Sequence, residues 1–355
     1  MGSSRLSNGA ACLAPGSRPL PSVTVSDDVC RSIAAFVRSR TIPEDREDSK
    51  LEGFTGPQVS NFYLLLVALC HQTSPRGKLP LEGTVGNRHL RGWDYLSAKL
   101  EAIAHISPII LSPSYWARIA ETDLREIFRD EILGERLSDP TGRVGLIQDL
   151  GEKMLRHSWA SADGFYALSE GRIASGNPNL LDLLSQFKAY SDPVRKKSFF
   201  FLALMRNAGI WTYVDSERLG APVDYHEVRG HLRIGTVQIC DPDLRSKLLA
   251  GLEVTAEDDI SIRQAVHEAL MLVSEYSGLR NPSQIHYMFW NIFRSCCTRE
   301  NPHCYSCTPT CSLPARYVPL ALFPDGTRHC PFANICESAG QEPKLFEHTF
   351  ETDYY

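Results

Sequence analysis

Residues 221–229 read Ala-Pro-Val-Asp-Tyr-His-Glu-Val-Arg, and this stretch places one carboxylate, that of Asp224, directly before a predicted helix. The chain is extended before Asp224 because Pro222 restricts the backbone there, and the pattern from His226 to Gly235 is typical of a helix. A carboxylate at a helix N-terminus is kept ionised by the backbone dipole. Aspartate is also a favoured N-cap, so on these residues alone a capping role competes with a catalytic one.

The stretch resembles the Val-Asp-Thr-His-Val-x-Arg signature of helix-hairpin-helix DNA glycosylases of the endonuclease III type, and Arg233-Ile234-Gly235 continues the likeness. In that family the aspartate is catalytic, which implies a catalytic role for Asp224. Tyr225 stands where the signature has Thr, and Glu227 stands where it has Val. The resemblance implies an all-α, two-domain fold with Asp224 at the cleft and Tyr225 at the surface that binds DNA or the extruded base.

The length and composition are those of a soluble globular protein with two domains. The chain has 355 residues, of which 43% are hydrophobic and 22% charged. No apolar run reaches about 18 residues, so the sequence predicts no membrane span and a cytoplasmic location. The formal net charge of -5 disfavours a polyanionic partner without excluding one, because basic residues can be gathered on one face.

Apolar periodicity predicts an all-α body. A first helix is expected from Ser26 to Arg38, and a central one, apolar nearly all round, from Gln58 to Cys70. Arg76 to Arg91 is expected to form a loop, and no alternating stretch is long enough for a sheet. The expected organisation is a flexible tail at 1–25, a six-helix domain at 56–220, and a second domain that joins 26–55 to 221–355.

Residues Tyr190 to Phe200 occupy the place of the hairpin Leu-Pro-Gly-Val-Gly-Arg-Lys-Thr in the glycosylase family. Asp192 and Val194 replace the two glycines that let backbone amides approach a DNA phosphate, so this anion site is not implied here. Lys196 aligns with the lysine that forms a Schiff base in bifunctional members. A phosphate contact or a surface charge is the alternative role for Lys196, and the loss of the glycines favours a monofunctional enzyme.

Three further residues are candidate contacts to DNA or to the base. Arg195 and Lys197 flank Lys196 in the same basic run. Gln72 follows the predicted central helix, where this family has a Gln that enters the gap left by the extruded base. A solvated helix end is the alternative interpretation of Gln72.

The same block, with its aromatic residues, is also similar to queuosine-salvage glycosylases, which cleave a free nucleotide. The similarity extends weakly upstream, through residues 92–95 and 113–128. Both resemblances imply cleavage of an N-glycosidic bond.

Cysteines are concentrated near the end of the sequence. Seven of the 11 lie between Cys296 and Cys336, and in a chain without a secretory signal such clustering favours metal ligation over disulfides. The spacing C-x6-C-x2-C, which begins at Cys297, resembles the opening of the [4Fe-4S] loop of the same glycosylases, which C-x5-C normally closes. A C-x5-C ending is present here, after an insertion from Thr308 to His329.

The resemblance implies a [4Fe-4S] cluster bound by Cys297, Cys304 and Cys336. The fourth ligand is Cys330 or Cys307, and Cys330 is favoured because it preserves the closing spacing. The alternative is zinc, for which Cys304, Cys307, Cys330 and Cys336 form a suitable tetrathiolate set. Either metal centre is expected to be structural.

We therefore expect a monomeric DNA N-glycosylase that flips out a modified base, hydrolyses its glycosidic bond and leaves an abasic site. The iron-sulfur loop resembles that of enzymes that act on DNA, whereas the net negative charge disfavours DNA, and a bulky modified base as the substrate would reconcile the two. Removal of modified bases from phage DNA is a biological role consistent with this substrate. One alternative is a queuosine-type nucleotide N-glycosylase. The other is a non-catalytic, metal-stabilised module that binds nucleic acid, which an Asp224→Asn variant distinguishes from an enzyme.

Overall fold

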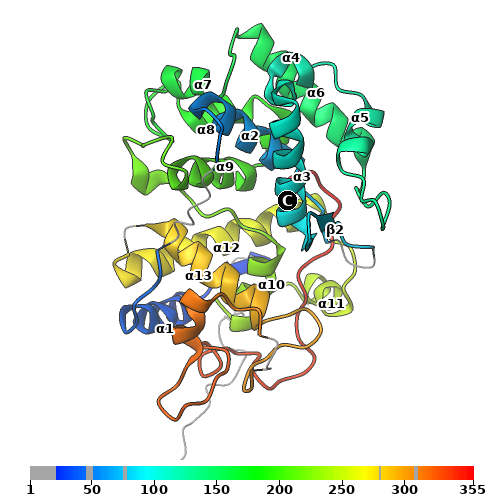
Figure 1. Ribbon diagram of the computed structural model, residues 1–355. Coiled ribbons are helices and arrows are strands. Elements are labelled where there is room, and N and C mark those ends of the chain that lie inside the picture. Colours follow the sequence, from blue (N-terminus) through cyan, green and yellow to red (C-terminus); the bar gives the residue numbers. More distant parts are fainter. Residues whose placement is uncertain (1–20, 45–50, 75–77, 280, 308–310) are drawn as a thin grey trace, which may run out of the picture. The chain divides into compact units, whose positions relative to one another are not determined.

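The computed structural model describes residues 21–44, 51–74, 78–279, 281–307 and 311–355, and these residues are mostly helical (Figure 1). They divide into two compact units. The first joins the described residues up to Glu44 to Val223–Phe350, and the second contains the described residues of 45–222 together with Glu351–Tyr355. None of the described helices has both the length and the hydropathy needed to cross a bilayer.

The second unit is built around the apolar helix α2 (Gly56–Leu69), which begins at a capping box between Thr55 and Gln58. Nearly every side chain from Val59 onward is buried, as expected for a helix that is apolar on all sides. The other α-helices of this unit are α3 (Gly92–Ile106), α4 (Pro113–Trp116), α5 (Glu121–Ile127), α6 (Pro140–Arg156), α7 (Asp163–Leu168), α8 (Leu180–Ser185) and α9 (Lys196–Asn207). Short 3-10 turns lie at Pro108–Leu111, Lys188–Tyr190 and Ser216–Arg218.

The first unit contains the helix that follows Asp224 and the cysteine-rich segment. Its α-helices are α1 (Asp27–Arg38), α10 (Tyr225–Ile234), α11 (Pro242–Ala250), α12 (Ala256–Ser277) and α13 (Pro282–Ser295), followed by a 3-10 turn at Ala315–Ala321. Helix α10 packs closely on α13 at Gly230, where a Cβ would lie 2.1 Å from Cδ2 of Phe293. Glycine at this position therefore sets the spacing of the two helices.

Two short antiparallel pairs depart from the expected all-α body. Strand β1 (Val23–Val25) pairs with β4 (Val237–Ile239), so the end of the predicted tail is a strand; residues 1–20 of that tail lie outside the described residues. Strands β2 (Glu82–Val85) and β3 (Arg88–Arg91) form a hairpin within the predicted loop, of which Arg76 and Gly77 are also outside the described residues. Gly86, with φ of +60°, permits the two-residue turn between them. Strands of three or four residues are too short for an alternation of apolar and polar residues to be recognised in the sequence.

The division into units differs from the expected one at three places. The described residues 51–55, which precede α2, belong to the second unit, and so do Ala221 and Pro222. Residues Glu351–Tyr355 also belong to it, because the N–H of Gln72 donates to the Tyr355 carbonyl and Lys78 pairs with Glu351. These contacts join residues that are far apart in the sequence, so local patterns cannot reveal them.

Candidate functional site

Asp224 is the N-cap of α10, and both of its carboxylate oxygens accept hydrogen bonds. Oδ1 accepts the backbone N–H groups of His226 at 2.8 Å and Glu227 at 3.2 Å. Oδ2 accepts the indole N–H of Trp290 at 2.7 Å. The half-buried carboxylate is thus fixed by the helix N-terminus on one side and by α13 on the other.

Glu227 also helps to hold Asp224 in place. Its carboxylate is buried, accepts the backbone N–H of Asp224 at 3.3 Å and lies 2.6 Å from Nδ1 of His286. Burial raises the pKa of Glu227. His286 and Trp290 are one turn apart on α13, so one face of this helix contacts both carboxylates. Their i, i+4 spacing was the available signal, but it did not identify Trp290 as the partner of Asp224.

Tyr225 and His226 lie beside Asp224, with ring centroids 4.2 Å apart. Burial raises the pKa of Tyr225 to about 12, so its phenol stays protonated. Burial also lowers the pKa of His226 to about 4. The Arg229 guanidinium, which can only donate, is 2.8 Å from Nδ1 of His226, so this imidazole is neutral and Nδ1 is an acceptor.

Two arginines of α10 connect the Asp224 region to the cysteine-rich segment. Arg229 donates to the Cys297 carbonyl at 2.8 Å. Arg233, one turn further on, donates to the carbonyls of Thr298 and Arg299 and approaches Sγ of Cys297 at 3.5 Å. The helix that begins at Asp224 therefore holds the first part of the cysteine segment in place.

Four of the predicted cysteine ligands line one cavity in the first unit: Cys297, Cys304, Cys330 and Cys336. Cys296 and Arg233 also line this cavity, whereas Cys307 is not among its lining residues. Burial raises the pKa of Cys336 to about 12 and raises that of Cys330 well above its usual range, so without a metal both thiols are protonated. A metal would replace these protons, and the buried Arg233 guanidinium would offset part of the charge of the thiolates.

The predicted basic contacts belong to the second unit, and Lys197 is not on its surface. The Lys197 side chain is fully buried, and its ammonium donates to the Ala68 carbonyl at 2.7 Å. This burial argues against the predicted direct DNA contact. Lys196 is also largely buried, with Nζ 5.1 Å from the ring centroid of Phe200, while Arg195 is half-buried.

Asp192 changes the chemistry of the segment before α9. Its buried carboxylate accepts the backbone N–H of Val194 at 3.1 Å and of Lys196 at 2.9 Å. Arg195 adopts a left-handed φ of 60°, a conformation more often given to glycine. The backbone amides of Val194 and Lys196 are therefore bonded to the chain's own carboxylate.

Gln72 lies just past the end of α2 in a left-handed conformation, with φ of 48°. Its N–H donates to the Tyr355 carbonyl at 3.1 Å, and its carbonyl accepts the Ser138 hydroxyl at 3.4 Å. The structure therefore places Gln72 in an ordered turn that the segment Glu351–Tyr355 contacts.

The sequence matches no protein-family model and none of the curated proteins. The function is therefore inferred from the residues and their geometry.

Proposed function

We propose that this protein is an N-glycosylase of the helix-hairpin-helix type with Asp224 as its catalytic carboxylate. The main support for the proposal is that both carboxylate oxygens of Asp224 are hydrogen-bonded, Oδ1 to backbone amides of α10 and Oδ2 to the Trp290 indole. A simple N-cap needs only the amides. The additional indole donor, supplied by a different helix, fixes the direction of the carboxylate as a catalyst requires.

Cleavage of an N-glycosidic bond develops positive charge at C1′ of the sugar. A fixed carboxylate stabilises this charge or activates the attacking water. Of the two carboxylates at this end of α10, Glu227 is fully buried against His286, so the half-buried Asp224 is the one that a substrate can approach. Asp224 is therefore assigned as catalytic and Trp290 as a positioning residue.

The cofactor proposed for the cysteine segment is a [4Fe-4S] cluster bound by Cys297, Cys304, Cys330 and Cys336. The donor set fits, because these four thiols line one cavity beside the buried Arg233 guanidinium. Such a cluster supplies a tetrathiolate cross-link that holds the segment against α10 and α13. Zinc on Cys304, Cys307, Cys330 and Cys336 fits less well, because Cys307 does not line that cavity.

The proposed substrate is DNA with a modified, bulky base. A second candidate, a free nucleotide as in queuosine salvage, is favoured by one observation. Asp192 occupies the backbone amides of Val194 and Lys196, so this segment offers no anchor for a DNA phosphate in its present conformation.

The proposal is tested by incubating the anaerobically purified protein with a panel of duplex DNAs that carry modified bases. Abasic sites are measured in parallel with base release from deazaguanine nucleotides. Abasic sites in one DNA identify the DNA enzyme, and release from nucleotides alone identifies the second candidate. DNA binding without any base release would contradict both proposals and indicate a non-catalytic binding module.

A further inference from the structure

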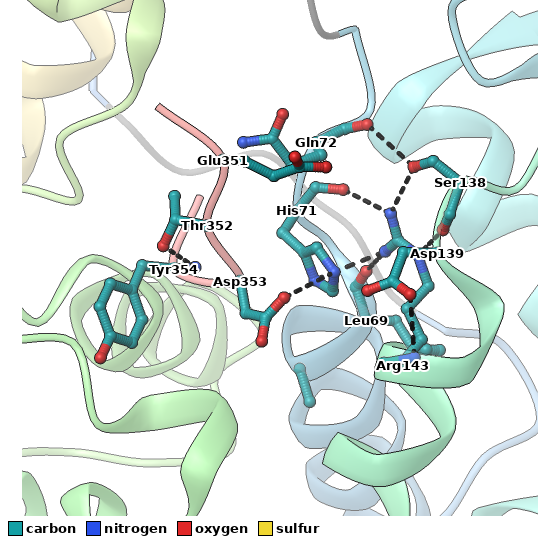
Figure 2. Close-up of polar contacts among 12 residues, drawn as sticks. Leu69, His71, Gln72, Ser138, Asp139, Arg143, Glu351, Thr352, Asp353 and Tyr354 are labelled. Carbon is teal, nitrogen blue, oxygen red and sulfur yellow. Dashed lines mark hydrogen bonds and ion pairs between the residues drawn. The ribbon is translucent and has the colours of Figure 1, made fainter. Parts of the chain in front are cut away.

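A buried polar cluster in the second unit lies just past the end of α2 and is not used by the proposed chemistry. Its centre is His71, which is 2% exposed (Figure 2). Arg143 of α6 and Lys197 of α9 lie near Nδ1 of His71, with nitrogen distances of 3.5 Å and 3.4 Å. On the other edge of the ring, Nε2 is 3.6 Å from Oδ1 of Asp353.

The hydrogen bonds determine which imidazole nitrogen carries the proton. A guanidinium can only donate, so Nδ1, which faces Arg143, is an acceptor. Burial and the charges of Lys197 and Arg143 hold the pKa of His71 well below its usual value, so the ring is neutral with its proton on Nε2. Among the described residues the buried Nε2–H has no hydrogen-bond partner within 3.5 Å, and it faces the Asp353 carboxylate.

This tautomer disfavours a cation at the same place. His71, Asp139 and Asp353 bring three potential ligand atoms within 4.8 Å of one another. A metal would need a lone pair on Nε2, whereas this nitrogen carries the proton. Moving the proton to Nδ1 would turn an N–H toward the Arg143 guanidinium, so the site is built for an anion.

The surrounding charges support the same conclusion. Arg143, Lys196 and Lys197 all act electrostatically on this cluster, and the carboxylates that act on Arg143 are those of Asp139 and Asp353. Asp353 is half exposed, and it comes from Glu351–Tyr355, a segment that returns to this unit. Figure 2 shows its carboxylate pointing toward the His71 ring. The exposed members of the cluster are thus its two carboxylates, and Asp353 is the one that lies closest to Nε2 of His71 on a separate segment.

We propose that His71 and Arg143, with Lys197 beside them, form a phosphate-binding site in which the Asp353 carboxylate is a built-in occupant that the phosphate displaces. The His71 Nε2–H would donate to a phosphate oxygen, and the buried Arg143 guanidinium would supply the attractive field. The assignment of the anion as phosphate rests on the proposed function, because both a nucleotide and DNA carry this group. The Gln72 N–H, now bonded to the Tyr355 carbonyl, would be released when the segment moves.

The test measures binding rather than turnover, so it remains informative even if the glycosylase proposal fails. Inorganic phosphate is titrated calorimetrically into the full chain and into Asp353→Asn, which removes the charge and keeps the shape. We expect Asp353→Asn to bind phosphate about fivefold more tightly or better, because one nearby negative charge is gone. Glu351→Gln is the matched control: Glu351 is in the same segment but pairs with the exposed Lys78, and this change should leave the affinity unaltered.

Two His71 variants in the Asp353→Asn background test the donor. His71→Phe should remove the gain in phosphate affinity, and His71→Gln, which keeps an N–H donor, should retain part of it. Thermal melting of both variants shows whether the fold survives, and His71→Gln provides the comparison if the Phe variant unfolds. Loss of the gain in folded His71→Phe supports the site, and an undiminished gain there overturns it.

Two further ligands identify the source of the phosphate. A nucleotide site predicts that dGMP binds Asp353→Asn at least about tenfold more tightly than inorganic phosphate. If the site binds DNA, Asp353→Asn should instead bind a short duplex more tightly than the original chain does. Its affinity for the duplex should also fall more steeply with salt, by the amount expected for about one additional phosphate contact. Unchanged or weaker phosphate binding in Asp353→Asn overturns the proposal, as does Mn²⁺ binding by the original chain that Asp353→Asn abolishes.

Discussion

The indole N–H of Trp290 donates to Oδ2 of Asp224 over 2.7 Å, and this bond joins the N-cap residue of α10 to the middle of α13. It adds to the ordinary capping bonds of Asp224, so it is the part of the site that helix formation does not explain. The α13 residue one turn earlier, His286, contacts Glu227 beneath it. The two helices thus define the position of the proposed catalytic carboxylate.

Trp290→Phe should lower kcat by about tenfold or more while leaving KM and the melting temperature nearly unchanged. The change removes one hydrogen bond to a charged group, worth about 1.5–3 kcal/mol, and keeps most of the apolar surface. A purely structural Trp290 would instead lower the melting temperature and leave kcat of the folded protein unchanged.

Gly230→Ala should destabilise the protein by about 1–3 kcal/mol, because the new methyl group would overlap the Phe293 ring. Gly145→Ala is the matched control, since Gly145 lies on an exposed face of α6 with nothing within 4 Å of its added Cβ. That control should be neutral or stabilising by about 0.5–1 kcal/mol. Urea unfolding measures both, and equal stabilities of the two variants would contradict the close packing of α10 on α13.

Glu347→Gln should destabilise the protein at pH 7 by about 3 kcal/mol. Burial opposes ionisation of Glu347, but Arg229 and Arg299 outweigh it and lower the pKa from 4.5 to about 2. The carboxylate therefore contributes stability above pH 4.5 that is lost as the pH falls toward 2. The difference in unfolding free energy between the two proteins should shrink over this window. Glu342→Gln should change the unfolding free energy far less, because the Glu342 carboxylate is exposed and its pairing with Lys344 is screened by solvent.

Cys304→Ser and Cys330→Ser should each remove the broad visible absorption expected of anaerobically purified protein, whereas Cys307→Ser should retain it. The first two thiols line the cavity and the third does not. A colourless protein with one zinc ion, which Cys307→Ser releases, would favour the zinc alternative. Iron and zinc contents are measured on the same samples.

Borohydride should not trap a covalent complex between the enzyme and DNA. Burial lowers the pKa of Lys197, which makes its amine less basic, but Nζ is enclosed and donates to the Ala68 carbonyl. Lys196 is also largely buried. The enzyme is therefore expected to stop at an abasic site. Efficient trapping that Lys196→Ala or Lys197→Ala abolishes would show that the enzyme is a lyase as well.

Local patterns predicted the parts of the structure that depend on neighbours in the sequence. The helix expected after Asp224 is α10, and Gly235, at which the prediction ended, is its left-handed C-cap with φ of 92°. The central apolar helix was likewise predicted to within two residues at its start. These features follow from capping and from apolar periodicity.

The features that the sequence did not reveal depend on long-range contacts. Lys197 stands in a basic triplet that is typical of a surface, yet its position on α9 faces the end of α2. The Trp290 bond to Asp224 spans 66 positions, and the Asp353 contact with His71 joins a late segment to the residues just past α2. No local propensity reports such pairings, because they arise only when the helices pack.

The most direct test compares Asp224→Asn with Asp241→Asn in the abasic-site and base-release assays. Asp241 caps α11 as Asp224 caps α10, with Oδ1 accepting the N–H groups of the residues two and three positions later. Both substitutions keep a good capping residue and remove one charge at a helix N-terminus. We expect Asp224→Asn to lower the single-turnover rate by about 100-fold or more and Asp241→Asn to leave it unchanged. Equal rates in the two variants would show that Asp224 is only a helix cap.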